Sequence, residues 1–180
     1  MTRFLNFDKK KYSEKFNTSL STAKDILKNK FEEYGKYNIL YYDDKYWSNY
    51  LEFNTQEELE KFEIQPTINN ELYEFINSIE IPKIIISTTT NLFIDYELKS
   101  KVKDFKKIYS CVDYFKTGGK TKNVFSSICE ELNVKPNEIL HIGDSKTMDV
   151  ANAKEAGVNA ILYENDLNKL KAEIKKYMEE

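Results

Sequence analysis

The sequence predicts an α/β protein with a doubly wound parallel sheet and a small helical insert. Residues 83–87, Lys-Ile-Ile-Ile-Ser, form an apolar run without alternation, which is typical of a strand buried on both faces. Residues 139–157 have the pattern of a strand, a loop and a helix, and residues 158–163 that of a further strand. Because such strands alternate with helical segments along the chain, we expect right-handed crossovers and a parallel sheet.

The composition indicates a soluble protein with one sizeable core and a small appended domain. The chain has 180 residues, 32% of them charged, and a net charge of −3, so no large basic face for nucleic acid is expected. Arg3 is the single arginine, so phosphate would be held by lysine, hydroxyls, backbone N–H groups or metal. No apolar run approaches the ~20 residues that span a membrane. Cys111 and Cys129 lack metal-ligand spacing and no secretory leader is visible, which favours reduced thiols in a cytoplasmic protein.

Two carboxylates follow the strand predicted near residues 139–142. Asp144 stands at its carboxyl end after Gly143, and Asp149 lies five residues on, where the loop turns into a helix that Gly157 ends. Open α/β sheets bind their ligands at this edge. Oxygen ligands from one or two carboxylates, completed by water and substrate phosphate, are what Mg²⁺ prefers. The pair therefore predicts a Mg²⁺ site, although Gly-Asp is also a common turn and Asp149 could be a helix N-cap.

This passage resembles the fourth motif of the haloacid dehalogenase-like (HAD) hydrolase superfamily. The shared pattern, here in residues 139–157, is an apolar strand, Gly-Asp, a short spacer, Asp, and a helix ending in Ala-Gly. The resemblance implies a Rossmann-like core with a small cap. It also implies a phosphatase that hydrolyses a small phosphorylated molecule through an aspartyl-phosphate with the help of Mg²⁺. The sequence leaves the identity of that molecule and the oligomeric state open.

The family's first motif, Asp-x-Asp-x-Thr at the end of the first strand, would fall at residues 3–12. Asp8 ends a short apolar run there, and the resemblance makes Asp8 both the nucleophile that attacks phosphorus and a ligand of Mg²⁺. Lys10 takes the place of the second Asp, the family's general acid and base, and Tyr12 takes that of Thr. This is the main departure from the family's pattern. An alternative position for the motif is residues 38–44.

Amphipathic helices are predicted in the segment that follows. Apolar residues recur at three- and four-residue spacing over residues 18–34, and Gly35 follows as a stop. Thr55 opens another helix with a capping box. Tyr46 and Trp47, between the two helices, could line a lid over the site or could simply make the core of a small helical unit.

These elements divide the chain into a helical cap at residues 14–64 and a HAD-like α/β core of residues 1–13 and 65–180. The cap resembles the insert that the family places just after its first strand. Within the core, helices with one apolar face are also predicted at about residues 70–79 and 167–177.

The family's second motif is a Ser or Thr at the end of a core strand, whose hydroxyl donates to a phosphate oxygen. Ser87 matches this position at the end of the run 83–87, and Thr88 adds a second hydroxyl for substrate binding. The alternative is that the Ser/Thr cluster, together with Asn91, caps the next helix.

The third motif is a lysine in a loop before a helix, which pairs with the nucleophile and with the transferring phosphate. We assign it to Lys120, in both a catalytic and a substrate-binding role, with Lys116 and Lys122 as alternatives. Gly118 and Gly119 would let the backbone of this loop approach other groups closely.

Two further features complete the core. A weak strand is predicted at residues 108–112. His141 alternates with apolar neighbours in the strand before Gly143, and we expect it to be a hydrogen-bonded core or wall residue without a chemical role.

In the mechanism that the resemblance implies, Asp8 attacks the phosphoryl group while Mg²⁺ is held by Asp8, Asp144 and Asp149. Lys120 and Ser87 hold the equatorial oxygens. Two other functions are compatible with the missing second Asp. One is a degenerate protein that binds a phosphorylated ligand or a protein partner without turnover, and the other is a metal-free haloacid dehalogenase.

Overall fold

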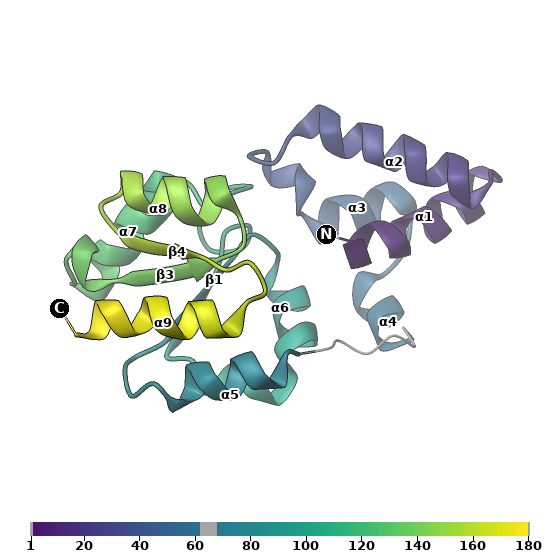
Figure 1. The fold of residues 1–180 in the computed structure, drawn as a ribbon. Coiled ribbons are helices and arrows are strands. Elements are labelled where there is room, and N and C mark those ends of the chain that lie inside the picture. Colours follow the sequence, from purple (N-terminus) through teal and green to yellow (C-terminus); the bar gives the residue numbers. More distant parts are fainter. Residues whose placement is uncertain (1, 62–67, 180) are drawn as a thin grey trace. The chain divides into compact units, whose positions relative to one another are not determined.

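A computed structural model describes residues 2–61 and 68–179, drawn in Figure 1. The chain splits into two compact units, one made of residues 1–69 and 80–119 and the other of residues 70–79 and 120–180. Each unit has one pair of parallel strands with helical crossovers, as the sequence predicted.

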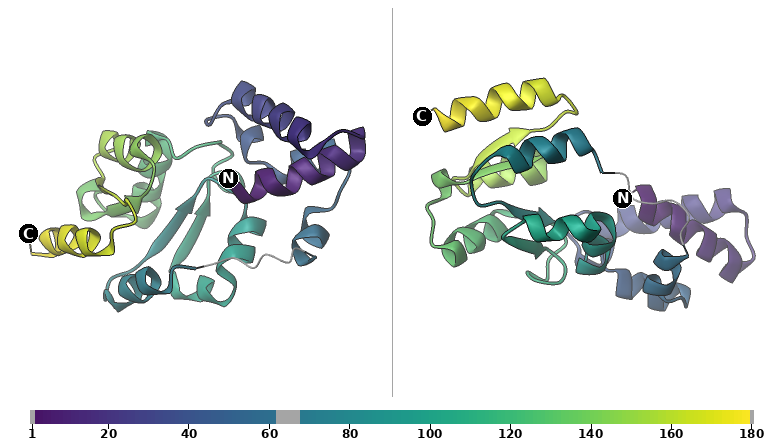
Figure 2. Two further views of the ribbon diagram at one scale, coloured as in Figure 1. Left: turned by 45° about the vertical axis from the view of Figure 1, so that its right-hand side comes forward. Right: turned by 90° about the horizontal axis from the view of Figure 1, so that it is seen from below.

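The first unit consists of a helical segment, α1 to α4, followed by a strand, a helix and a second strand. Its elements are α1 (Thr2–Phe16), α2 (Leu20–Tyr34), the 3-10 turn η1 (Ile39–Tyr41), α3 (Asp44–Leu51), α4 (Thr55–Glu60), β1 (Ile84–Ser87), α6 (Asn91–Leu98), η2 (Lys99–Asp104) and β2 (Lys107–Ser110). The strands β1 and β2, in teal, run side by side in the left view of Figure 2. Their register places Ser87 opposite Ser110, so both strands end in a serine.

Aromatic side chains make the core of the helical segment. Trp47 on α3 is fully buried, and its indole N–H donates to the carbonyl of Leu40 over 2.8 Å. Tyr46 is half-buried, and its hydroxyl lies 2.5 Å from that of Tyr34. Of the two roles predicted for Trp47, the structure shows the structural one. The other buried members of this core are Tyr12, Ala23, Leu27, Phe31, Tyr41 and Leu51.

The strand predicted at residues 3–8 is wrong, because Thr2–Phe16 is the helix α1. Short apolar runs do not distinguish strands from helices, and the residues that follow decide the outcome here. Tyr12 and Phe16 are one helical turn apart, their rings 4.4 Å from centre to centre, and Tyr12 packs into the core of the helical segment. The alternative position at residues 38–44 is not a strand either, since it contains η1 and the N-cap of α3.

The predicted stop of α2 at Gly35 is confirmed, whereas the capping box predicted to begin at Thr55 is wrong, because Asn54 is the N-cap of α4. Ser19 caps α2 by accepting from the backbone N–H of Thr22, and Gly35 ends the helix with a φ of 72°. Asn54 caps α4, which begins at the predicted Thr55.

Gly118 shows the close backbone approach that was expected of its loop. A methyl group built on Gly118 would lie 2.2 Å from the carbonyl oxygen of Asn38. The loop after β2 therefore lies directly against the start of η1.

We expect Gly118→Ala to lower the free energy of unfolding by about 2 kcal/mol, because the new methyl meets backbone atoms that can move only together with the chain. Urea unfolding measures the change. Lys116→Ala, an exposed substitution in the same loop, is the control and should alter stability by less than about 0.5 kcal/mol. Equal effects of the two substitutions would contradict this account of the contact.

The second unit has helices on both sides of its strand pair (Figure 1). Its elements are α5 (Asn70–Ser78), α7 (Lys122–Leu132), η3 (Pro136–Glu138), β3 (Leu140–Gly143), the π-helix η4 (Lys146–Ala151), α8 (Asn152–Glu155), β4 (Asn159–Leu162) and α9 (Leu167–Met178). Apolar residues of α5 and α9 pack together with β3 and β4, around the buried Ile161, Leu170 and Ile174. The ring of Phe125 on α7 lies 5.0 Å from that of His141 on β3, so α7 packs on this strand too.

The predicted cap boundaries do not coincide with these units. The boundary after residue 13 falls inside α1, and the one after residue 64 lies outside the described residues. The division into cap and core stays a prediction.

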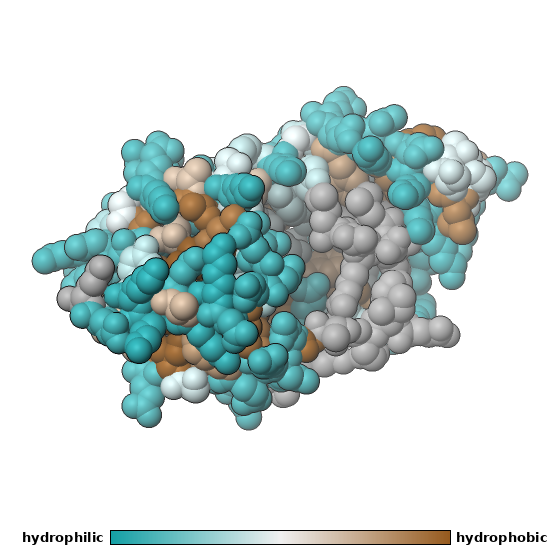
Figure 3. Space-filling model, in the orientation of Figure 1, coloured by the Kyte–Doolittle hydropathy of each residue, from teal (hydrophilic) through white to brown (hydrophobic). Residues whose placement is uncertain are grey.

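The coloured part of the face in Figure 3 is largely hydrophilic, with smaller hydrophobic patches between hydrophilic residues. In the part of the chain that the structure describes, no helix is both long and apolar enough to cross a membrane.

Candidate active site at the carboxyl end of β3

Asp149 is the centre of a polar cluster that follows β3. The side chain of Ser145 accepts from the N–H of Met148 and so caps the π-helix η4, which places Asp149 in its first turn. The helix thus begins before Asp149, and Ser145 rather than Asp149 is the cap. Asp149 is 2% exposed.

Three donors hold the carboxylate of Asp149. Its Oδ1 lies 2.5 Å from Nζ of Lys120 and 2.8 Å from Nε2 of His141. Its Oδ2 accepts from the N–H of Ser145 over 2.9 Å. Burial alone would raise the pKa of Asp149, but the His141 hydrogen bond and the Lys120 ammonium outweigh it and hold this pKa well below its usual range. Asp149 is therefore an ionised, fully engaged carboxylate.

Gly143, the last residue of β3, makes room for this carboxylate. A methyl group built on Gly143 would lie 2.2 Å from Cγ and 2.5 Å from Oδ2 of Asp149. Any larger residue would displace the cluster, so the glycine of the Gly-Asp pair has a packing role as well as a turn role.

Lys120 is the lysine that the structure brings to this cluster. Its side chain is 14% exposed, and its carbonyl accepts from the side-chain amide of Asn152. Lys122 is exposed and pairs with Glu155 over 3.6 Å. Lys116 is exposed and belongs to the first unit. Of the three candidate lysines, Lys120 is the one that pairs with Asp149 in the described residues.

His141 is a hydrogen-bonded wall residue, as expected, but its partner was not foreseen. The hydrogen bond between His141 and Asp149 was not predicted. A usable signal was that His141 precedes Gly143 by two residues, which puts it on the same side of β3 as the turn that leads to Asp149. Ser145, four residues before Asp149, was missed as the cap.

Asp144 is the exposed carboxylate of the site. Within the described ranges, it forms no ion pair or hydrogen bond, and no group of three or more His, Cys, Asp or Glu side chains is arranged to hold a metal ion. Mg²⁺ commonly takes one or two carboxylates and completes its shell with water and phosphate. Asp144 fits such a partial shell, whereas the carboxylate of Asp149 is already held by three donors.

Ser87 and Thr88 lie in the first unit, at the end of β1. The hydroxyl oxygen of Ser87 accepts from the N–H of Thr89 over 3.3 Å, which leaves the hydroxyl proton free to donate. Ser87 therefore ends a strand, as expected, and its role as a donor to phosphate stays a prediction. Asn91 begins α6, and its N–H donates to the carboxylate of Asp113.

Asp8 and Lys10 lie in α1 and not at the end of a strand. Lys10 is exposed. Asp8 was assigned as nucleophile and metal ligand, and Lys10 as the acid–base residue. Both assignments assumed that the two residues follow a core strand, and the helix α1 does not provide that position.

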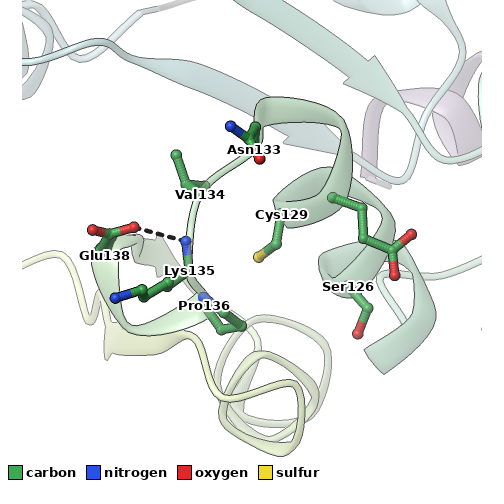
Figure 4. A pocket seen from close by; sticks show the side chains of 8 residues that line it. Ser126, Cys129, Asn133, Val134, Lys135, Pro136 and Glu138 are labelled. Atoms are coloured by element: carbon green, nitrogen blue, oxygen red, sulfur yellow. Dashed lines mark hydrogen bonds between the residues drawn. The ribbon is translucent and has the colours of Figure 1, made fainter.

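A hollow in the second unit is separate from the cluster. It has a volume of about 520 Å³ and lies between the end of α7 and η3 (Figure 4). It is lined by Ser126, Cys129, Glu130, Asn133, Val134, Lys135, Pro136 and Glu138. None of the cluster residues borders it, and burial raises the pKa of the Cys129 thiol, which makes that thiol a poor nucleophile.

Comparisons with known proteins identify the family of the chain. The family model for haloacid dehalogenase-like hydrolases matches residues 10–157, and the chain belongs to this family. Asp144, Asp149 and Lys120 fall inside the matched range, whereas Asp8 falls outside it.

Among solved structures, the chain is similar to a HAD phosphatase from Thermococcus onnurineus. The TM-score is 0.69 at 19% identity, over 92% of this chain and 79% of the other, which confirms the fold. The UTR4 protein of Saccharomyces cerevisiae matches with a TM-score of 0.48 at 13% identity, over 85% of this chain and 69% of the other. No curated protein sequence matched the chain.

Proposed function

We propose that the chain is a Mg²⁺-dependent phosphohydrolase that acts on a small phosphorylated molecule. The observation that carries the proposal is the Lys120–Asp149 ion pair beside the exposed Asp144 at the carboxyl end of β3. Membership of a hydrolase family supports the reaction class.

Each residue has a defined task in this proposal. Asp149 fixes the ammonium of Lys120, which would neutralise the charge of a phosphoryl group. Asp144 would hold Mg²⁺, which supplies further positive charge to that group when bound. Ser87, in the first unit, stays the sequence-based candidate for a hydroxyl that donates to a phosphate oxygen. Asp8 stays the sequence-based candidate for the nucleophile.

Binding without hydrolysis is the second candidate function. It is favoured by the position of Asp8 and Lys10 within a helix, because the attacking carboxylate and its acid–base partner would then be missing from the strand end. The chain would bind the same phosphorylated ligand and release it unchanged.

Phosphate release from p-nitrophenyl phosphate in MgCl₂ tests the proposal. We expect activity that chelation with EDTA removes, and a loss of about 100-fold in Lys120→Met, since single preorganised charge contacts contribute about that much. Asp144→Asn should be impaired to a similar degree. The matched control is Lys122→Met, an exposed lysine on the same segment, which should keep native activity.

The possible outcomes distinguish the two candidates. Orthophosphate binding without any turnover would establish the second one. Activity that persists in Asp8→Asn would move the nucleophile to another residue. Chloride release from a haloacid without metal would instead indicate the dehalogenase reaction.

A further inference from the structure

His141 has a fixed place on β3. Residues 141 and 143 lie on the same face of the strand, and Asp149 covers this face, because a methyl group on Gly143 would meet its carboxylate. The ring of His141 lies edge-to-face against that of Phe125, with 71° between the two planes, and its side chain is 10% exposed. Phe125 is itself buried on α7. Strand and helix together therefore leave the imidazole little freedom to turn.

The direction of the hydrogen bond between His141 and Asp149 follows from the charge of the acid. Burial disfavours the ionised form of Asp149, but the donors around it outweigh burial and keep its pKa well below the usual range. An ionised carboxylate can only accept hydrogen bonds. Nε2 of His141, 2.8 Å from Oδ1, therefore carries the proton of this hydrogen bond and is the donor.

Each oxygen of the Asp149 carboxylate has a donor on a rigid frame. Oδ2 accepts from the backbone N–H of Ser145, and Oδ1 accepts from the imidazole of His141. The third donor, the ammonium of Lys120, lies 2.5 Å from Oδ1 but ends a flexible four-carbon side chain. Without His141, Oδ1 would be held only by a group that can move with it. The imidazole thus decides where the carboxylate holds the ammonium.

Lys120 is fixed at both ends of the residue and can still bind a ligand. Its carbonyl accepts from the side-chain amide of Asn152 over 2.6 Å, which holds the backbone. An ammonium has three N–H donors, and the pair with Asp149 takes one of them. The side chain of Lys120 is 14% exposed, so the ammonium is held inside the cluster while part of the side chain is open to solvent.

We propose that His141 is a positioning residue that aims the ammonium of Lys120 at the phosphoryl group by fixing the carboxylate of Asp149. This inference rests on the proposed function, in which Lys120 neutralises the charge of that group. His141 itself touches no ligand in this role. It acts through its hydrogen bond to Asp149 and through the ion pair of Asp149 with Lys120.

Calorimetric titration with inorganic phosphate in MgCl₂ tests this role in two variants that differ by one methylene. His141→Asn has an amide too short to reach Oδ1, and we expect it to weaken phosphate binding about tenfold, the effect of losing a hydrogen bond to a charged group. His141→Gln can bring an amide N–H to the place of Nε2, so it should bind phosphate within about twofold of the native chain. If His141→Asn does not fold, His141→Leu, which also lacks the donor, takes its place.

A double variant separates positioning from a direct contact with phosphate. Lys120→Met should weaken phosphate binding strongly. Adding His141→Asn to Lys120→Met should weaken it by less than about twofold more, because both changes act on one ammonium. Full additivity in the double variant, native binding in His141→Asn, or equal losses in His141→Asn and His141→Gln would each overturn the positioning role.

The matched control for stability is Ile142→Val, at the next residue of β3 and on its opposite face. Ile142 packs against the core that Ile161 forms with Leu170 and Ile174 of α9. Removing one methyl group from this partly buried side chain should lower the melting temperature and leave phosphate binding native. If phosphate binding weakens as much in Ile142→Val as in His141→Asn, lost stability explains both variants and the positioning role is wrong.

Failure of the proposed function has a different signature. If the native chain binds no phosphate, or if Lys120→Met binds it as the native chain does, both the task of Lys120 and this inference are wrong. If Lys120→Met loses phosphate binding but His141→Asn does not, the function stands and only the role of His141 is wrong.

Discussion

Asp149→Asn is expected to lower the free energy of unfolding by about 3 kcal/mol at pH 7. The substitution keeps the shape of the side chain but removes the charge that holds the nearly buried ammonium of Lys120. Removing one partner of a buried ion pair leaves the other charge uncompensated, which costs more than the pair itself contributes. Urea unfolding followed by circular dichroism measures the difference.

Asp144→Asn is the matched control, because it makes the same chemical change at an exposed carboxylate five residues away. It should alter stability by less than about 0.5 kcal/mol in the absence of metal. If both variants unfold at the same urea concentration, the cluster around Asp149 does not stabilise the fold.

The effect of Asp149→Asn should also depend on pH. The folded pKa of Asp149 is depressed from a usual value near 3.8, so its carboxylate contributes stability that is fully present above that value. This contribution is lost as the pH falls through the folded pKa. Lys120 and His141 are the charged or titratable groups that face the carboxylate. The native chain and Asp149→Asn should therefore approach equal stability as the pH falls below about 3.8.

The sequence predicted the second unit better than the first, for a physical reason. Around β3, apolar periodicity, Gly-Asp and the Gly157 stop all require the same strand, loop and helix, so independent signals agree. The strand at Ile84–Ser87 was likewise recognisable from its β-branched run.

For the N-terminal residues, no independent sequence signals agree on one structure. A short apolar run at residues 3–7 fits a strand or a helix, and its conformation is decided by packing of the following turns, as at Tyr12. The π-helix η4 was also beyond prediction, since its extra residue per turn leaves no mark on the apolar pattern. The ion pair between Lys120 and Asp149 could not be predicted from the sequence, because the two residues lie 29 residues apart along the chain.

Gly143→Ala is expected to destabilise the fold by about 3 kcal/mol, although it adds only one methyl group at the end of a strand. Ideal geometry places that methyl 2.2 Å from Cγ of Asp149 and 2.5 Å from its Cβ and Oδ2. Asp149 cannot move aside without loosening its bonds to Lys120, His141 and Ser145, so the cost combines overpacking with partial loss of the ion pair.

A double-mutant cycle separates this cause from backbone strain. Asp149→Gly removes the three atoms nearest to the added methyl, so in that background Gly143→Ala should cost less than about 1 kcal/mol. Phosphate binding should depend on the same cluster around Asp149. We therefore expect Gly143→Ala to weaken phosphate binding about as strongly as Asp149→Asn does. A cost of about 3 kcal/mol that persists in the Asp149→Gly background would show that Gly143 is required by its own backbone and not by the carboxylate beside it.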